Sequence, residues 1–202
     1  MTLRTARRGG TKARKQQLRA AALRKRRSIT PRELAALSSL VGDNVRALKE
    51  YKEARLVISY CAKEDEVQTR PIITKALEEG KRVAVIVTDV PSKTLSFSEI
   101  HSFDDELVPG AFDIPEPMPG HLRPVSIAQA DLILVPLVAW DEKGRRLGYG
   151  AGYFDRALEG AGKLCKVGLA LESQRVPQIP ESRHDIPLDM IVTEKRVVRP
   201  AR

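Results

Sequence analysis

Apolar residues near the start of the chain recur with the spacing of helices. Residues 12–27 place Leu18, Ala22 and Leu23 among lysines and arginines, which predicts a basic amphipathic helix. Residues 31–51 carry an apolar residue every three or four positions and predict a second helix. We interpret the apolar face of the second helix as a packing surface and not as a ligand contact.

Past residue 55 the pattern changes to short β-branched runs that alternate with helical stretches. Residues 56–60 and 83–87 are such runs, and residues 69–79 between them have helical spacing. Strand, helix and strand in this order predict two parallel strands joined by a right-handed crossover. Gly80 stands where this helix is expected to end, because glycine adopts a left-handed turn at little cost.

Strand patterns return in the second half of the chain. Prolines recur over residues 91–124, so an irregular connection is expected there. Strands are predicted at residues 132–137, 167–171 and 190–193, and a helix over residues 153–160. With 202 residues, 42% of them hydrophobic, the chain can bury one sizeable core. The sequence therefore predicts one α/β domain: an open, mainly parallel sheet flanked by helices in a Rossmann-like, three-layer arrangement, with a basic N-terminal helix.

Positive charge is concentrated at the start of the chain. Residues 1–32 hold twelve lysines or arginines and no acidic residue, and subtracting these twelve from the total of 35 leaves 23 basic against 26 acidic residues. The net charge of +9 therefore comes from an N-terminal arm. Residues 1–11 offer little to bury and are expected to be disordered, with residues 12–202 forming a single domain.

The basic arm is compatible with several roles. It could contact phosphate, serve as a transit peptide or form a solvated tail, and its few serines disfavour the transit peptide. Binding to nucleic acid is disfavoured, because the remainder of the chain is mildly acidic and has no stacking-aromatic or recognition-helix pattern.

Other classes of protein and site are excluded by what the sequence lacks. No apolar run reaches the roughly 18 to 20 residues of a membrane-spanning helix, and no apolar N-terminal stretch resembles a secretory signal. We therefore expect a cytoplasmic protein with no membrane partner. Separately, we expect a monomer. Cys61 and Cys165 have no metal-ligand spacing and are expected to be neutral thiols. The three histidines are too scattered to predict a zinc site.

A glycine-rich loop follows the apolar run at residues 131–137. Gly148, Gly150 and Gly152 occupy alternate positions, where the missing Cβ atoms let backbone amides approach a ligand closely. The N-terminus of the following helix adds free amides and partial positive charge, which suits phosphate. The spacing is neither that of the P-loop nor that of the dinucleotide fingerprint.

Charged residues around the loop strengthen this interpretation. Arg145, Arg146 and Arg156 supply cations for a polyphosphate, and Asp155 supplies a carboxylate able to hold magnesium.

The stretch Arg146-Leu-Gly-Tyr-Gly-Ala-Gly-Tyr-Phe-Asp-Arg156, with Pro136 and Trp140-Asp141 before it, closely resembles the signature of the 5-formyltetrahydrofolate cyclo-ligase family. Weaker matches follow the family's order along almost the whole chain: Lys15-Gln-Gln-Leu-Arg19, Glu66, Thr69, Ile114-Pro-Glu-Pro117, Gly168-Leu-Ala-Leu171, Gln174, Pro180, His184-Asp185, Asp189 and Thr193. Trp140, Phe154 and Asp113 depart from the family's usual residues.

The resemblance implies a reaction. In it, 5-formyltetrahydrofolate becomes 5,10-methenyltetrahydrofolate with ATP as co-substrate and Mg²⁺ as cofactor, and ADP and phosphate are released. The formyl oxygen attacks the γ-phosphate to give an imidate-type phosphate, N10 closes the ring, and phosphate leaves. Such a protein must neutralise a polyphosphate, hold the oxygen in line with phosphorus and exclude water.

The resemblance also implies roles for individual residues. Arg146 is the implied catalytic residue, treated as a flexible loop cation whose removal leaves the fold intact. The implied nucleotide-binding residues are Lys15, Arg19, Arg146, Leu147, Gly148, Tyr149, Gly150, Ala151, Gly152, Tyr153 and Phe154. The implied substrate-binding residues are Cys61, Glu66, Tyr149, Gly150, Ala151, Gly152 and Tyr153, and the implied magnesium ligands are Asp155 and Asp185.

Plainer interpretations of these residues remain open at this point. Lys15 and Arg19 could form a solvated basic face, and Glu66 could be a solvated charge after a strand. Asp155 could favour a helix N-terminus, and Asp185 could be a turn residue. We interpret the adjacent histidine, His184, as orienting Asp185 and not as a general base. The alternative function is that of a divergent relative that binds nucleotide and folate but acts on another substrate or regulates.

Overall fold

The computed structural model describes residues 3–201, with side chains for residues 10–201. The helices are α1 (Leu3–Arg27), α2 (Pro31–Ala47), α3 (Lys49–Glu53), α4 (Arg70–Glu78), α5 (Phe103–Glu106) and α6 (Tyr153–Leu158), with short 3₁₀ helices η1 (Ala111–Asp113), η2 (Pro119–His121), η3 (Ile127–Gln129) and η4 (Glu172–Gln174). The strands are β1 (Leu56–Ser59), β2 (Arg82–Asp89), β3 (Thr94–Ile100), β4 (Leu107–Pro109), β5 (Pro115–Pro117), β6 (Pro124–Val125), β7 (Leu132–Pro136), β8 (Ala139–Trp140), β9 (Arg146–Leu147), β10 (Cys165–Leu169), β11 (Met190–Val192) and β12 (Val197–Val198). No helix within the described residues is long and apolar enough to cross a bilayer.

One large sheet forms the centre of the protein. Its strand order is β12-β11-β10-β7-β1-β2-β3-β6. The strands from β11 to β2 pair in parallel, whereas β12, β3 and β6 pair antiparallel at the two edges. The central strands are apolar on both faces: the residues of β1 are all buried, and Leu132 to Val135 in β7 are 0% exposed. The predicted α/β fold with an open, mainly parallel sheet flanked by helices is confirmed.

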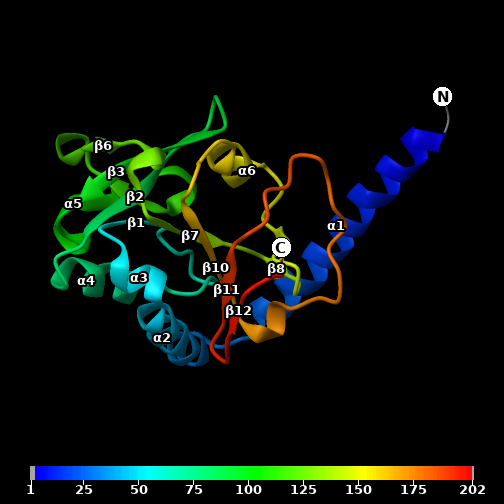
Figure 1. Ribbon diagram of the computed structural model, residues 1–202, viewed down its shortest axis with the longest axis horizontal. Coiled ribbons are helices and arrows are strands. Elements are labelled where there is room, and N and C mark those ends of the chain that lie inside the picture. Colours follow the sequence, from blue (N-terminus) through cyan, green and yellow to red (C-terminus); the bar gives the residue numbers. More distant parts are fainter. Residues whose placement is uncertain (1–2, 202) are drawn as a thin grey trace.

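The helices cover the sheet on both sides (Figure 1). From β1 the chain crosses through α4 to β2, and from β7 it crosses through α6 to β10 on the other side of β1. Because parallel crossovers are right-handed, two crossovers that run in opposite directions place α4 and α6 on opposite faces. The direction changes between β1 and β7, so a crevice opens at the carboxyl ends of these two strands.

The first helix begins earlier than the sequence predicts. It starts at Leu3 and not near Lys12, and in Figure 1 its first turns project away from the rest of the protein. Once a helix has formed, extending it backward adds one backbone hydrogen bond per residue, and no proline precedes Pro31 to stop it. Residues 1 and 2 of the predicted disordered arm lie outside the described residues, and the division at residue 11 stays a prediction.

Two further elements differ from the prediction. The second helix is divided at Leu48, whose extended backbone separates α2 from α3 and directs Leu48 and Tyr51 into the core. The region expected to be irregular contains β3, a seven-residue strand paired antiparallel with β2. The prolines of this region lie outside β3, and pairing with the buried β2 stabilises it although its own sequence is half polar.

Candidate active site

A cavity of about 1240 Å³ lies at the crevice between β1 and β7. Every site residue predicted from the sequence lines it: Lys15, Arg19, Cys61, Glu66, residues 146–155 and Asp185. These residues come from α1, the segment after β1, the glycine loop and the loop before β11. Tertiary folding therefore brings together residues that are up to 170 positions apart in sequence.

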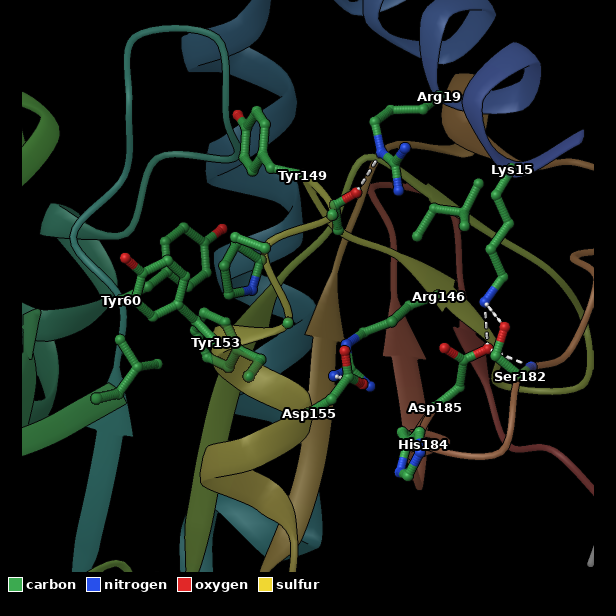
Figure 2. Close-up of a pocket in the computed structure, with 18 of the residues that line it drawn as sticks. Lys15, Arg19, Tyr60, Arg146, Tyr149, Tyr153, Asp155, Ser182, His184 and Asp185 are labelled. Carbon is green, nitrogen blue, oxygen red and sulfur yellow. Dashed lines mark hydrogen bonds and ion pairs between the residues drawn. The ribbon is translucent and has the colours of Figure 1, made fainter. Parts of the chain in front are cut away.

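Helix α1 contributes cations to one side of the cavity. The Nζ atom of Lys15 donates to Asp185 Oδ2 at 2.5 Å and to Ser182 Oγ at 2.8 Å. The Nε atom of Arg19, one turn further along, donates to the carbonyl oxygen of Gly148 at 2.7 Å. Figure 2 shows both side chains pointing from α1 toward the loop and the carboxylate. Lys15 and Arg19 are therefore not a solvated face.

The glycine loop begins with a pinned hairpin. Strands β8 and β9 pair antiparallel, and the carboxylate of Asp141 between them is 0% exposed. Asp141 accepts hydrogen bonds from the backbone of Lys143 and Ile179 and from Arg145 Nε, the last at 2.7 Å. Arg145 also binds Glu181 and does not line the cavity. The hairpin therefore places the next residue, Arg146, in a defined position.

Arg146 is buried and held at two points. Its Nη2 donates to Asp155 Oδ1 at 2.7 Å, and its Nη1 donates to the carbonyl oxygen of Ile186. The residue is only 8% exposed, and burial lowers the pKa of its guanidinium. The expectation of a flexible loop cation is wrong, because β-pairing and these two contacts hold the side chain against the body of the protein.

The backbone conformation of the loop favours glycine at two positions. Gly150 and Gly152 have φ values of +103° and +74°, a region that favours glycine. A Cβ atom at Gly150 would also approach Nη2 of Arg19 to 3.2 Å. Glycine at this position thus allows the loop and α1 to meet at the cavity.

The opposite side of the cavity holds a buried carboxylate. Glu66 is 5% exposed; its Oε2 accepts from the amide of Lys63 at 3.0 Å, and its Oε1 accepts from the hydroxyl of Tyr149 at 3.1 Å. Burial raises the pKa of Glu66, and the Lys63 amide and the nearby Arg26 oppose this shift. Glu66 is therefore not a solvated charge. Cys61, beside it in the lining, is 2% exposed, and burial raises its pKa to about 12, so its thiol is neutral.

Sequence reasoning missed Phe112, which forms an aromatic wall of the cavity with the predicted Tyr153. The rings of Phe112 and Tyr153 pack edge to face with centroids 6.4 Å apart, and Lys63 Nζ lies 5.4 Å from the Phe112 centroid. Phe112 is 55% exposed and has a φ of +59°, which is uncommon for a residue with a side chain. The signal that could have identified Phe112 from the sequence is its position just before the Ile114-Pro-Glu-Pro117 match.

Two carboxylates flank Arg146 in Figure 2. Asp155 accepts from Arg146 and, at 3.3 Å, from the amide of Ile186, both through Oδ1. Asp185 accepts from Lys15 and from the amide of Ser182, both through Oδ2. In residues 3–201 no group of three or more histidines, cysteines or acidic residues has the arrangement of a metal site. Asp155 and Asp185 are the two carboxylates beside Arg146 that could bind a cation.

Comparisons with known proteins match most of the chain to one family. A family model described as the 5-formyltetrahydrofolate cyclo-ligase family matches residues 11–194. The 5-formyltetrahydrofolate cyclo-ligase of Escherichia coli (strain K12) is 30% identical over 176 residues, which cover 86% of this chain and 96% of that protein. A probable 5-formyltetrahydrofolate cyclo-ligase of Schizosaccharomyces pombe is 34% identical over 167 residues, which cover 75% of this chain and 81% of that protein.

A solved structure shows the same fold. The NMR structure of Aquifex aeolicus 5,10-methenyltetrahydrofolate synthetase matches with a TM-score of 0.81 and 37% sequence identity, over 93% of each chain. The family match over residues 11–194 includes every residue that lines the cavity. From this match and the two relatives we conclude that the chain belongs to the 5-formyltetrahydrofolate cyclo-ligase family of enzymes.

Proposed function

We propose that this protein converts 5-formyltetrahydrofolate to 5,10-methenyltetrahydrofolate and couples the reaction to the conversion of ATP to ADP and phosphate. The observation that carries the proposal is that one cavity holds groups suited to both substrates. Lys15, Arg19 and Arg146 line the cavity together with the glycine loop, as Figure 2 shows, and the buried carboxylate Glu66 lines it where it contacts Tyr149 of that loop. One cavity can thus hold a polyphosphate and a pterin close enough to react.

The cationic side suits the phosphates of ATP. Lys15, Arg19 and Arg146 converge on it from α1 and β9. The guanidinium of Arg146 is largely withdrawn from water, where its charge acts on a phosphate with less screening than at the surface. Backbone amides from Leu147 to Phe154 can approach the β- and γ-phosphates where glycine omits the Cβ atom.

The carboxylate side suits the pterin. Each oxygen of Glu66 accepts one hydrogen bond from the protein and retains capacity for another. Two adjacent acceptors match the paired N–H donors of an amino-pyrimidinone edge. Tyr149, Tyr153 and Phe112 offer aromatic surface to the reduced ring or the aminobenzoyl group.

The chemistry then requires positioning and charge neutralisation. The formyl oxygen forms a bond to the γ-phosphorus while the bond to the ADP oxygen breaks. N10 attacks the activated formyl carbon and loses its proton, and phosphate departs with the formyl oxygen. Arg146 would stabilise the charge that develops on the transferred phosphoryl group. His184 is exposed, and in Figure 2 it lies on the side of Asp185 away from Lys15, so we assign it no proton transfer.

Asp155 and Asp185 fit a magnesium site. Each uses one carboxylate oxygen in the contacts described above and has a second oxygen to offer, and each side chain is 33% exposed. Magnesium typically joins one or two carboxylates to substrate phosphates and retains several waters. When bound, the ion would supply positive charge to the phosphates; Lys15 and Arg146 would hold the two carboxylates in place.

The proposed function is tested by mixing purified protein with 5-formyltetrahydrofolate, ATP and magnesium and following the near-ultraviolet absorbance of methenyltetrahydrofolate. We expect an increase that requires all three components, with one ADP formed per product. Absence of product from a preparation that binds ATP would contradict the proposal. It would favour a divergent relative that acts on another substrate.

Replacing Asp155 with asparagine should raise the magnesium concentration needed for half-maximal rate by about tenfold, since a neutral amide is a weaker ligand than a carboxylate. The measurement is a magnesium titration at fixed ATP. Glu159→Gln, the corresponding acid-to-amide change at an exposed position after α6, is the matched control and should keep the wild-type midpoint. An unchanged midpoint in Asp155→Asn would show that Asp155 is not a ligand.

A further inference from the structure

One buried arginine lies beside the cavity but outside its lining. Among the cations of α1 whose side chains are described, Arg26 is the most deeply buried, at 3% exposure. It does not line the cavity, whereas Lys15 and Arg19 on the same helix do. Positions 15, 19 and 26 fall on one face of a helix, so a single face of α1 reaches both Asp185 and Arg26's partners.

Arg26 binds the tip of the glycine loop and the segment after β1. Its Nη2 donates to Asp65 Oδ2 at 2.9 Å and to the hydroxyl oxygen of Tyr149 at 2.5 Å. Its Nε donates to the same Asp65 oxygen at 3.2 Å, and its Nη1 donates to the Leu137 carbonyl oxygen at 3.4 Å. Every donor-bearing nitrogen of the guanidinium is therefore engaged.

These contacts determine the direction of the hydrogen bond between Tyr149 and Glu66. A guanidinium only donates, so the oxygen of Tyr149 must accept from Arg26. The single phenolic proton is then left for Glu66 Oε1, 3.1 Å away. Without Arg26 the phenol could turn its proton elsewhere and accept a hydrogen bond from a protonated Glu66. Arg26 thus favours the ionised carboxylate and sets its orientation.

We propose that Arg26 is a positioning residue for substrate recognition, which acts through Tyr149 to hold Glu66 as an ionised, fixed acceptor of two hydrogen bonds. The proposal rests on the proposed function, in which Glu66 binds the amino-pyrimidinone edge of the folate. It adds a residue that touches no substrate and that links α1 to the folate side of the cavity.

The surroundings of Glu66 are consistent with this role. Burial raises the pKa of Glu66, and the charge of Arg26 and the Tyr149 hydroxyl act in the opposite direction. The charge of the neighbouring Asp65 raises the pKa of Glu66 further. The Lys63 amide, Arg26 and Tyr149 therefore stabilise the carboxylate against burial and against Asp65.

The test compares Arg26→Lys, Tyr149→Phe and the double variant in the absorbance assay. Lysine keeps the charge of Arg26 but cannot donate to Asp65 and Tyr149 in the same planar geometry. We expect each single variant to raise the KM for 5-formyltetrahydrofolate by about tenfold, the factor that corresponds to about 1.4 kcal/mol and to loss of one charge-assisted hydrogen bond. The KM for ATP should change little.

The double variant distinguishes positioning from general packing. Because Arg26 acts through Tyr149, the double variant should be no worse than Tyr149→Phe alone, whereas independent effects would multiply. Arg27→Lys, the same change at the adjacent exposed position, is the matched control and should keep both KM values. Thermal unfolding of each variant checks the fold, and Tyr149→Phe, on a half-exposed residue, tests the link if Arg26→Lys does not fold.

Three outcomes would overturn the proposal. These are an unchanged folate KM in Arg26→Lys, an unchanged folate KM in Tyr149→Phe, or multiplicative effects in the double variant. If the wild-type protein forms no methenyltetrahydrofolate, the proposed function fails and this inference fails with it. If the wild type is active and the variants keep its folate KM, the proposed function stands and the proposed role of Arg26 fails.

Discussion

Exchanging Arg146 for lysine should lower kcat by about a hundredfold or more, the range found when a preorganised donor to a transition state is removed. The guanidinium of Arg146 bridges Asp155 and the Ile186 carbonyl while it lines the cavity. A single ammonium group cannot keep both contacts and reach a phosphate. Steady-state kinetics should show the loss mainly in kcat, because the interaction strengthens as charge moves onto the transferred phosphoryl group.

The control for this prediction is the neighbouring arginine. Arg145→Lys makes the same change in the same hairpin, but Arg145 binds Asp141 and Glu181 and lies outside the cavity lining. It should keep the wild-type kcat. A wild-type kcat in Arg146→Lys would remove Arg146 from the reaction. Arg146→Ala is the poorer test, because it removes a buried side chain and leaves Asp155 without its partner, which should also lower the melting temperature.

Replacing Glu66 with glutamine should raise the KM for 5-formyltetrahydrofolate by at least about tenfold, which corresponds to the loss of one hydrogen bond to a charged acceptor. Glutamine has one acceptor oxygen, and its NH₂ group would face donors, either the Lys63 amide or the Tyr149 hydroxyl. The folate edge would then meet a donor where it needs an acceptor. Affinity for ATP, measured separately by its KM, should remain close to that of the wild type.

The pH dependence of folate binding provides a second measurement on Glu66. Because burial raises its pKa, the carboxylate takes up a proton at higher pH than an exposed glutamate does. The folate KM of the wild type should therefore rise as pH falls through this raised pKa, and the rise should be absent in Glu66→Gln. The charged and titratable groups around Glu66 are Arg26, Asp65, Tyr60 and Tyr149. Tyr60 and Tyr149 have raised pKa values and Arg26 stays charged, so the protonation of these three groups does not change on acidification. A folate KM that rises equally in both proteins would assign the titration to another group.

The sequence by itself determined the class of fold. Apolar runs such as Leu132 to Val135 have no polar face, and they alternate with helical stretches; this pattern requires a parallel sheet covered on both sides. It also predicted the glycine loop that lines the cavity, since Gly148, Gly150 and Gly152 lie beside Arg146 and Asp155 within one short segment. Local patterns suffice here because the interacting residues are close in sequence.

Only the tertiary structure decided where the chain departs from local preference. Pairing with the buried β2 makes β3 a strand, although its polar residues and the surrounding prolines suggested irregular chain. The same holds for Arg146, whose surroundings in the sequence resemble a flexible loop. The β8–β9 pairing and contacts from Asp155 and Ile186 bury it. Pairing and burial depend on residues far apart in the chain, which local spacing does not report.

The role of Arg26 shows this limit most clearly. In the sequence it is one of four consecutive basic residues, Arg24 to Arg27, and nothing local separates it from its neighbours. In the structure it alone among these four is buried, with Asp65 and Tyr149 as its partners, 39 and 123 positions away. The sequence thus determined which chemical groups are available and which local elements form. Tertiary packing decided which of several identical side chains leaves water and what it contacts, because burial is set by distant elements and not by adjacent residues.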